Sequence, residues 1–162
     1  MSAVHVGHID HDNPKSERFF GYLTSSDLER ECQRQLYKNG YSALLLDESK
    51  KKCGNQLAAL DIEIDGVKMD IRSITGHGWY SNAFVAKNDQ LRRYNSREDV
   101  STPADSVCLY FHDPSLFDPT NMEKSINYFR HYRTKDGSLL KRELKNVYCV
   151  IRGNNEILKF QI

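Results

Sequence analysis

The sequence predicts an α/β domain of the α+β kind, with a single mixed β-sheet, packed helices and the order α-β-β-β-α-β-α-β-β. Three observations predict this fold. Segments with a helical stripe of apolar residues alternate with short apolar runs of strand length. Asp65-Gly66 joins two alternating runs, as in a tight hairpin. A helical segment separates the third and fourth strands and permits a parallel crossover between them.

Each element has a local reason in the sequence. Ser26-Asp27-Leu28-Glu29 is a capping box, and Gly40 marks the end of the helix that follows it. Ser81 is suited to cap a helix that runs to about Asn95, and Asp118-Pro119 opens another helix. The expected strands are 41–46, 60–64, 67–74, 106–111, 147–151 and 157–162.

Composition limits the classes of protein that the chain can represent. It has 162 residues, 39% of them hydrophobic, and 23 Lys and Arg against 22 Asp and Glu. This balance excludes a disordered tail and a protein that coats nucleic acid through bulk charge. No apolar run reaches the roughly 20 residues of a membrane span, so we expect none.

We expect residues 1–18 to form a polar N-terminal arm and residues 19–162 to form one domain. His5, His8 and His11 in the arm have a spacing that can bind metal, but its composition favours a solvated segment. Cys32, Cys53, Cys108 and Cys149 occur singly, so we expect free thiols in a reducing compartment rather than a zinc site; two disulfides remain an alternative.

The hairpin around Asp65-Gly66 carries the clearest chemical signal. Pairing across a two-residue turn brings Asp61 close to Asp70, and Arg72 lies on the same face as Asp70. Two carboxylates so placed can hold Mg²⁺, and a guanidinium beside them can bind phosphate. The alternative is an ordinary hairpin whose charged face lies in solvent.

The motif resembles the D…(D/E)-x-K core of restriction-endonuclease-like nucleases. The chain also resembles the C-terminal tRNase domains of contact-dependent growth inhibition toxins and the related nuclease tails of phage head proteins, grouped with the barnase–EndoU–colicin–RelE (BECR) superfamily. The segments that carry this resemblance occur in the same order in those families: Gly40-Tyr41, Asp61, Ile64-Asp65-Gly66, Asp70-Ile71-Arg72-Ser73 and Thr75-Gly76.

The resemblance covers roughly residues 24–162 and implies roles for individual residues. Asp61, Asp70, Arg72 and His77 would be catalytic, while Thr75, Lys87 and Gln90 would bind substrate. Three positions depart from the family pattern, with Leu60 for Pro, Asp70 for Glu and Arg72 for Lys. Because arginine does not readily lose its proton, Arg72 is unsuited to act as a base.

Other polar residues have weaker signals. Glu31 can complete a carboxylate cluster, although a solvated helix face explains it as well. His112 and Asp113 end a strand as polar loop residues. Tyr128, Tyr132 and their basic neighbours form a helix surface suited to contact RNA, or an ordinary partly buried helix.

We therefore expect a ribonuclease that cleaves RNA, with tRNA as substrate, in a toxin-like or phage-related setting. Its site of action would be the cytoplasm, after delivery into a target cell, and a toxin would need an immunity protein as partner. A restriction-endonuclease-like site would use Mg²⁺ at Asp61 and Asp70, whereas a BECR-type site would use no metal. The alternatives are an inactive nuclease fold that binds a partner and a metal-dependent DNA endonuclease.

Overall fold

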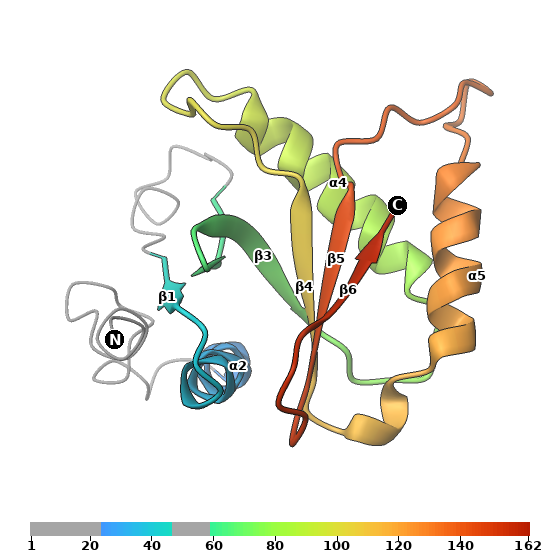
Figure 1. Cartoon of the computed structure of the whole chain (residues 1–162). Helices are drawn as coiled ribbons and strands as arrows, with labels where there is room; N and C mark the ends of the chain where they lie inside the picture. The colour runs from blue at the N-terminus through green and yellow to red at the C-terminus, as the bar shows by residue number, and fades with distance from the viewer. Residues whose placement is uncertain (1–23, 47–58) are drawn as a thin grey trace.

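The computed structural model describes residues 24–46 and 59–162, which form one six-stranded mixed sheet with three α-helices (Figure 1). The elements are α2 (Thr24–Lys38), β1 (Ala43–Leu45), β2 (Ile62–Ile64), β3 (Val67–Ser73), α4 (Ser81–Asn95), β4 (Ser106–Phe111), the 3-10 helix η2 (Pro114–Leu116), α5 (Pro119–Arg130), β5 (Asn146–Ile151) and β6 (Leu158–Gln161). The predicted fold class and element order are confirmed.

The strands lie side by side in the order in which they occur along the chain. β1, β2 and β3 form an antiparallel meander, β3, β4 and β5 are parallel, and β6 returns antiparallel to β5. Each parallel pair needs a crossover, which α4 provides between β3 and β4 and α5 between β4 and β5. Figure 1 shows α4 crossing behind β4 and β5.

The turn between β2 and β3 sets the register of the hairpin. Asp65 and Gly66 have φ angles of 46° and 87°, and positive values at both central residues define a type I′ turn. The Asp65 carboxylate also accepts a hydrogen bond of 2.8 Å from the backbone N–H of Ser42. Ile62 then pairs with Met69, so the residues before and after this pair, Asp61 and Asp70, come together.

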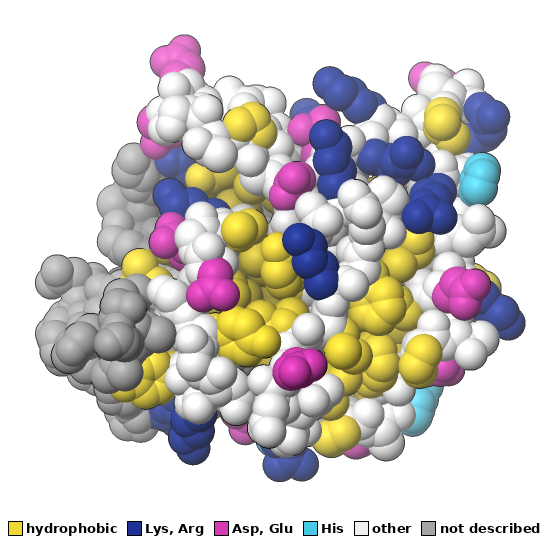
Figure 2. Space-filling model, in the orientation of Figure 1, with side chains coloured by type: hydrophobic (Ala, Val, Ile, Leu, Met, Phe, Trp, Pro, Cys, Tyr) yellow, Lys and Arg dark blue, Asp and Glu magenta, His cyan; other side chains and the backbone are white. Residues whose placement is uncertain are grey.

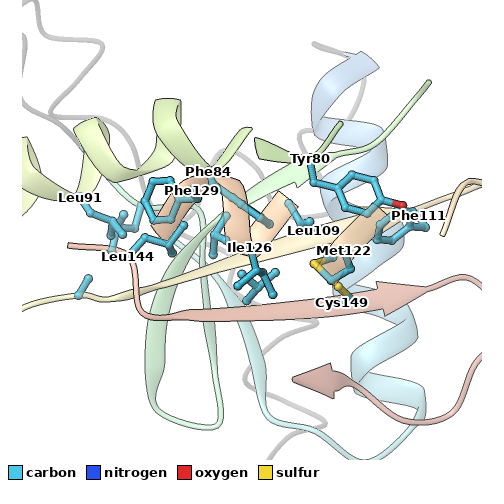
Figure 3. Packing of buried hydrophobic residues seen from close by; sticks show 14 of the residues in the cluster. Tyr80, Phe84, Leu91, Leu109, Phe111, Met122, Ile126, Phe129, Leu144 and Cys149 are labelled. Carbon is cyan, nitrogen blue, oxygen red and sulfur yellow. The ribbon is translucent and has the colours of Figure 1, made fainter. Parts of the chain in front are cut away.

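The sheet is covered on both faces, and β4 is buried along its whole length. Leu109 and Phe111 join a core cluster with Phe84 of α4 and Phe129 of α5 (Figure 3). Alternate side chains of a strand point to opposite faces, so Cys108 and Tyr110, on either side of Leu109, instead pack with α2. In Figure 2, hydrophobic side chains gather in the middle of the face seen in Figure 1, with charged ones scattered around them.

Some element boundaries differ from those expected. The first helix begins at Thr24, ahead of the capping box. Tyr80 is the N-cap of α4, without a side-chain hydrogen bond, so the expected cap at Ser81 is wrong, and that residue is buried in the first turn. The cap at Asp118 is confirmed, since its carboxylate accepts from the backbone N–H of Thr120. The 3-10 helix η2 was not among the expected elements, because three residues are too few to show a helical period of apolar side chains.

The expectation of free thiols is met where the structure describes them: Cys32, Cys108 and Cys149 are buried and unpaired by disulfides. Cys53 and the N-terminal arm with its histidines lie outside the described residues. Within 24–46 and 59–162, none of the helices combines the length and the apolar character that a membrane crossing demands.

Truncating a buried side chain of β4, the strand that packs on both of its faces, tests this packing. We expect Leu109→Ala to lower the free energy of unfolding by about 2–5 kcal/mol, because Leu109 is fully buried and truncation leaves a cavity. Urea denaturation of both proteins measures the difference. Leu139→Ala is the matched control, since Leu139 is 53% exposed and its loss should change stability by less than about 0.5 kcal/mol. Equal effects of the two substitutions would contradict this description of the core.

Candidate active site

Two aspartates lie together between the sheet and α4. Asp61 directly precedes β2, and Asp70 is in the middle of β3. They are only 6% and 4% exposed, respectively. The alternative of an ordinary hairpin whose charged face lies in solvent is therefore wrong for both residues. Lys87 of α4 lies against Asp70 and helps to shield it from solvent.

Backbone contacts fix Asp61 in place. Its N–H donates to the Met69 carbonyl over 3.2 Å, and its carbonyl accepts from Leu46 over 2.8 Å. Its carboxylate oxygen Oδ2 accepts a hydrogen bond of 2.9 Å from the backbone N–H of Ile71. Asp61 thus links β1, β2 and β3, and its carboxylate is held by the strand that carries Asp70.

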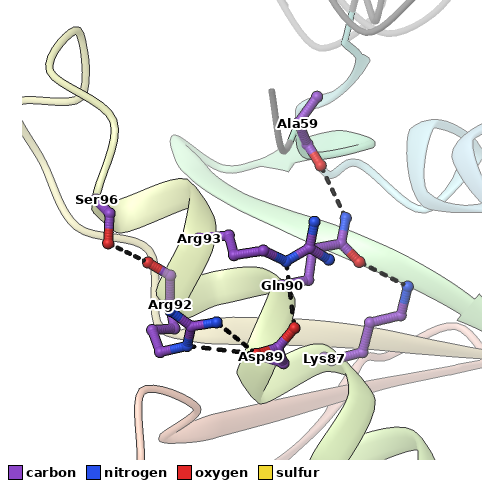
Figure 4. A network of polar contacts seen from close by, with 7 residues as sticks. All are labelled: Ala59, Lys87, Asp89, Gln90, Arg92, Arg93 and Ser96. Carbon is purple, nitrogen blue, oxygen red and sulfur yellow. Dashed lines mark hydrogen bonds and ion pairs between the residues drawn. The ribbon is translucent and has the colours of Figure 1, made fainter. Parts of the chain in front are cut away.

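α4 supplies a lysine and a glutamine to the same place. Lys87 Nζ forms an ion pair and hydrogen bond with Oδ2 of Asp70, and donates over 3.2 Å to Oε1 of Gln90. Gln90 in turn donates over 2.9 Å to the carbonyl of Ala59, close to Asp61 in the chain (Figure 4). The structure therefore brings together four of the residues singled out from the sequence: Asp61, Asp70, Lys87 and Gln90. We call these four residues the acidic site.

The two carboxyl groups of the acidic site are buried close together, and this changes the pKa of Asp70. Burial raises the pKa of Asp70 well above its ordinary value, and the neighbouring Asp61 raises it further, while Lys87 acts in the opposite direction. Oδ1 of Asp70 is buried and has no hydrogen-bond partner within the described part of the chain. A buried acceptor in this position favours a shared proton or a bound cation between the two carboxylates.

The other predicted site residues lie further along β3 and beyond it. Arg72 and Thr75 line a shallow depression of about 190 Å³ together with Trp79. His77 is exposed in the loop after β3. Asp113, two residues beyond β4, has its pKa lowered mainly by hydrogen bonds from Ser115, with a smaller contribution from His77. The structure thus places Arg72 on the strand of the acidic site but does not bring His77 into that site.

Glu31 belongs to a different cluster, so its suggested place in the carboxylate group is wrong. Its Oε2 accepts a hydrogen bond of 2.5 Å from the Tyr110 hydroxyl and contacts Nδ1 of His112. Tyr110 packs with α2, on the face of the sheet opposite the cluster formed with α4 and α5. His112, expected to be a solvated loop residue, is therefore tied to α2. Sequence periodicity gave no signal for this contact, because it joins a helix to a strand distant in the chain.

Comparison with known proteins adds no relative: the chain matches no family model, no curated protein and no solved structure.

The raised pKa of Asp70 has a consequence for stability. Below about pH 4, the usual pKa of an aspartate, the group is protonated in both the folded and the unfolded chain. Above it, the unfolded chain releases the proton while the folded chain retains it, so this group costs stability as pH rises toward the folded pKa. We expect wild type to lose stability relative to Asp70→Asn across this window, by at most about 1.4 kcal/mol per pH unit.

Urea denaturation of both proteins at a series of pH values measures this difference. Asp89→Asn is the control on the same helix, because Asp89 is 55% exposed and hydrogen bonds from Arg92 lower its pKa. That substitution should not reproduce the trend. A difference between wild type and Asp70→Asn that grows in favour of wild type as pH rises would show that Lys87 outweighs burial and Asp61.

Proposed function

We propose that this chain is a nuclease that cleaves RNA at the acidic site. The observation that carries the proposal is the buried pair Asp61–Asp70 lying directly beneath Lys87, beside Gln90. A carboxylate pair supplies groups for proton transfer, and an adjacent ammonium supplies positive charge for a phosphate. Perturbed carboxyl groups with a specific charged partner are typical of catalytic sites.

The pair is suited to the two proton transfers that RNA cleavage needs. The 2′-oxygen of a ribose attacks the adjacent phosphorus, the bond from phosphorus to the 5′-oxygen breaks, and a 2′,3′-cyclic phosphate forms. With one proton shared between Asp61 and Asp70, the ionised carboxylate accepts the proton of the 2′-hydroxyl. The protonated carboxyl gives its proton to the leaving 5′-oxygen. The raised pKa of Asp70 supports its holding that proton above the usual range of an aspartate.

Lys87 and Arg72 are the candidates for holding the phosphate. In the free protein Lys87 is engaged by Asp70 and Gln90, and its side chain is 15% exposed. A phosphate that enters the site competes for this ammonium and draws it away from the carboxylate, which uncovers Asp70 for proton transfer. Arg72, which follows Asp70 on the same strand face and is exposed, is placed to bind the next phosphate of the chain.

The acidic site also suits a divalent cation. Mg²⁺ is commonly bound through one or two carboxylates and several waters, and the unpartnered Oδ1 of Asp70 is a fitting donor beside Asp61. Asp61 and Asp70 would hold the ion, which when bound would neutralise phosphate charge and acidify a water molecule. Within residues 24–46 and 59–162, no group of three or more His, Cys, Asp and Glu side chains is arranged to hold a metal.

The choice of tRNA as substrate rests on the resemblance to toxin tRNase domains alone. The proposals of an immunity protein as partner and of action in the cytoplasm of a target cell rest on the same resemblance. The chemistry of the acidic site supports RNA as a class, because the 2′-hydroxyl gives the carboxylate pair a nucleophile to activate.

A second candidate function is a binding module that keeps the nuclease fold without turnover. The burial of both carboxylates beneath Lys87 favours it, since substrate reaches them only after this side chain moves. Tight binding of RNA or DNA by the folded protein without product would support this candidate over the enzyme.

The first test is cleavage of mixed tRNA and of plasmid DNA, each with Mg²⁺ and with EDTA. We expect tRNA to be cut and plasmid DNA to remain intact. Cleavage that survives EDTA would assign the chemistry to the proton-sharing pair, and EDTA-sensitive cleavage would assign a cation to it. Absence of RNA cleavage by the folded protein, or cleavage of DNA alone, would contradict the proposal.

Substitutions then locate the activity. We expect Asp70→Asn and Lys87→Met each to lower the rate of tRNA cleavage by about 100-fold or more, because the first removes a group for proton transfer and the second a positive charge that holds the phosphate. Asp89→Asn on the same helix should leave the rate close to that of wild type. Circular dichroism would establish that the variants fold. Full activity in Asp70→Asn would exclude the acidic site as the catalytic centre.

A further inference from the structure

Three aromatic rings form a continuous row on the surface beyond the acidic site. Trp79 precedes α4 and makes an edge-to-face contact with Tyr128 of α5, at 6.4 Å between ring centroids. Tyr128 makes a similar contact with Tyr132 at 6.1 Å. Trp79 is 55% and Tyr128 52% exposed, while Tyr132 is half-buried. We call Trp79, Tyr128 and Tyr132 the aromatic strip.

The position of Trp79 is fixed from both sides by α5. The side chain of Asn121 donates over 3.1 Å to the carbonyl of Gly78, and the N–H of Tyr80 donates over 3.1 Å to Oγ of Ser125. Ser125 is itself buried and bonded to Asn121 over 2.8 Å. The backbone on either side of Trp79 is therefore anchored, yet its indole remains in solvent. An anchored, exposed indole differs from a tryptophan at the end of a free loop.

The strip continues into the depression that contains Arg72. The residues that line this hollow of about 190 Å³ include Arg72, Thr75, Trp79 and Asn82. Its aromatic wall and its guanidinium are the two groups that a nucleotide needs, one for the base and one for the phosphate. Since Arg72 and Asp70 are two residues apart on one strand face, the hollow lies near the acidic site.

The helix face that carries Tyr128 has basic character. Lys124 lies one turn before Tyr128, and Arg133 directly follows Tyr132; both are exposed. Glu123 on the same helix lines a separate hollow with Pro119 and Phe160. The strip is thus accompanied by basic side chains, which favours an anionic partner over an apolar one.

From this arrangement we propose that the aromatic strip stacks the unpaired bases of single-stranded RNA, while Arg72 binds a backbone phosphate between the strip and the acidic site. The inference rests on the proposed function for its choice of RNA, and it names the form of RNA that the site takes. Stacking tolerates any base because every base has a π-face, so the strip would select single strands without selecting sequence. A duplex keeps its bases paired and stacked and offers the strip little to bind.

Trp79 is the chain's single tryptophan, so its fluorescence reports binding directly. The probe is a short oligouridine with 2′-O-methyl riboses, which wild-type protein cannot cut through a 2′-hydroxyl. We expect saturable quenching by this single strand and little quenching by the same strand paired in a duplex. Because no cleavage is involved, binding here with no activity on tRNA would overturn the proposed function and leave the strip assigned.

Variants separate stacking from simple attraction of charge. Tyr128→Ala should weaken oligouridine binding about 5- to 150-fold, the range for loss of one base-stacking ring, whereas Tyr128→Phe should retain it. For Trp79→Ala, which removes the reporter, anisotropy of a labelled oligouridine should show a similar loss. Val67→Ala is the control, since Val67 is 36% exposed at the opposite end of β3.

Three results would overturn the inference. They are unchanged affinity in Tyr128→Ala, equal quenching by inorganic polyphosphate, and absence of quenching by any nucleic acid. The second would assign the surface to charge alone, and the third would favour a protein as the partner of the strip.

Discussion

The burial of two carboxylates against one lysine is the constraint that this fold has to satisfy. A carboxylate loses hydration when it is buried, and two neighbouring carboxylates also repel one another. Asp61 is stabilised by the N–H of Ile71 and Asp70 by Lys87. Both compensating groups are delivered by the fold: the first by the register of the β2–β3 hairpin, the second by the packing of α4.

The sheet topology explains why these groups meet. The type I′ turn at Asp65-Gly66 fixes the hairpin register, so Asp61 lies next to Asp70. α4 is the crossover that makes β3 and β4 parallel, and a crossover helix must pack on the sheet it connects. Phe84 and Leu91 anchor α4 in the core, which leaves Lys87 and Gln90 directed at β3 and Ala59. Hydrophobic packing thus positions a polar site that would not form by itself.

The sequence predicts those parts of the fold that depend on local patterns. The alternation around Asp65-Gly66, the apolar stripe of α5 and the cap at Asp118 each arise within a few residues, and each is confirmed. The proximity of Asp61 and Asp70 follows from the same hairpin pairing.

What the sequence could not predict depends on packing between distant elements. Alternation along β3 left it open whether Asp70 is buried or exposed to solvent, because periodicity does not reveal which faces a helix will cover. The contact of Glu31 with Tyr110 and His112 is of the same kind. So is the aromatic strip, which joins Trp79 to rings on a helix distant in the chain. The role expected for Lys87 came from the resemblance to nuclease domains. Its position on a helix face alone would not have indicated that role.

The proposed chemistry therefore depends on the protonation of one buried side chain. The most direct measurement is a titration of the Asp70 carboxyl carbon by ¹³C NMR in the folded protein. We expect a midpoint well above about 3.9, the ordinary pKa of an aspartate, with the neighbouring Asp61 shifting in the same titration. A midpoint at or below the ordinary value would mean that Lys87 keeps Asp70 fully ionised, and the pair could not then hold the proton that the proposed chemistry requires.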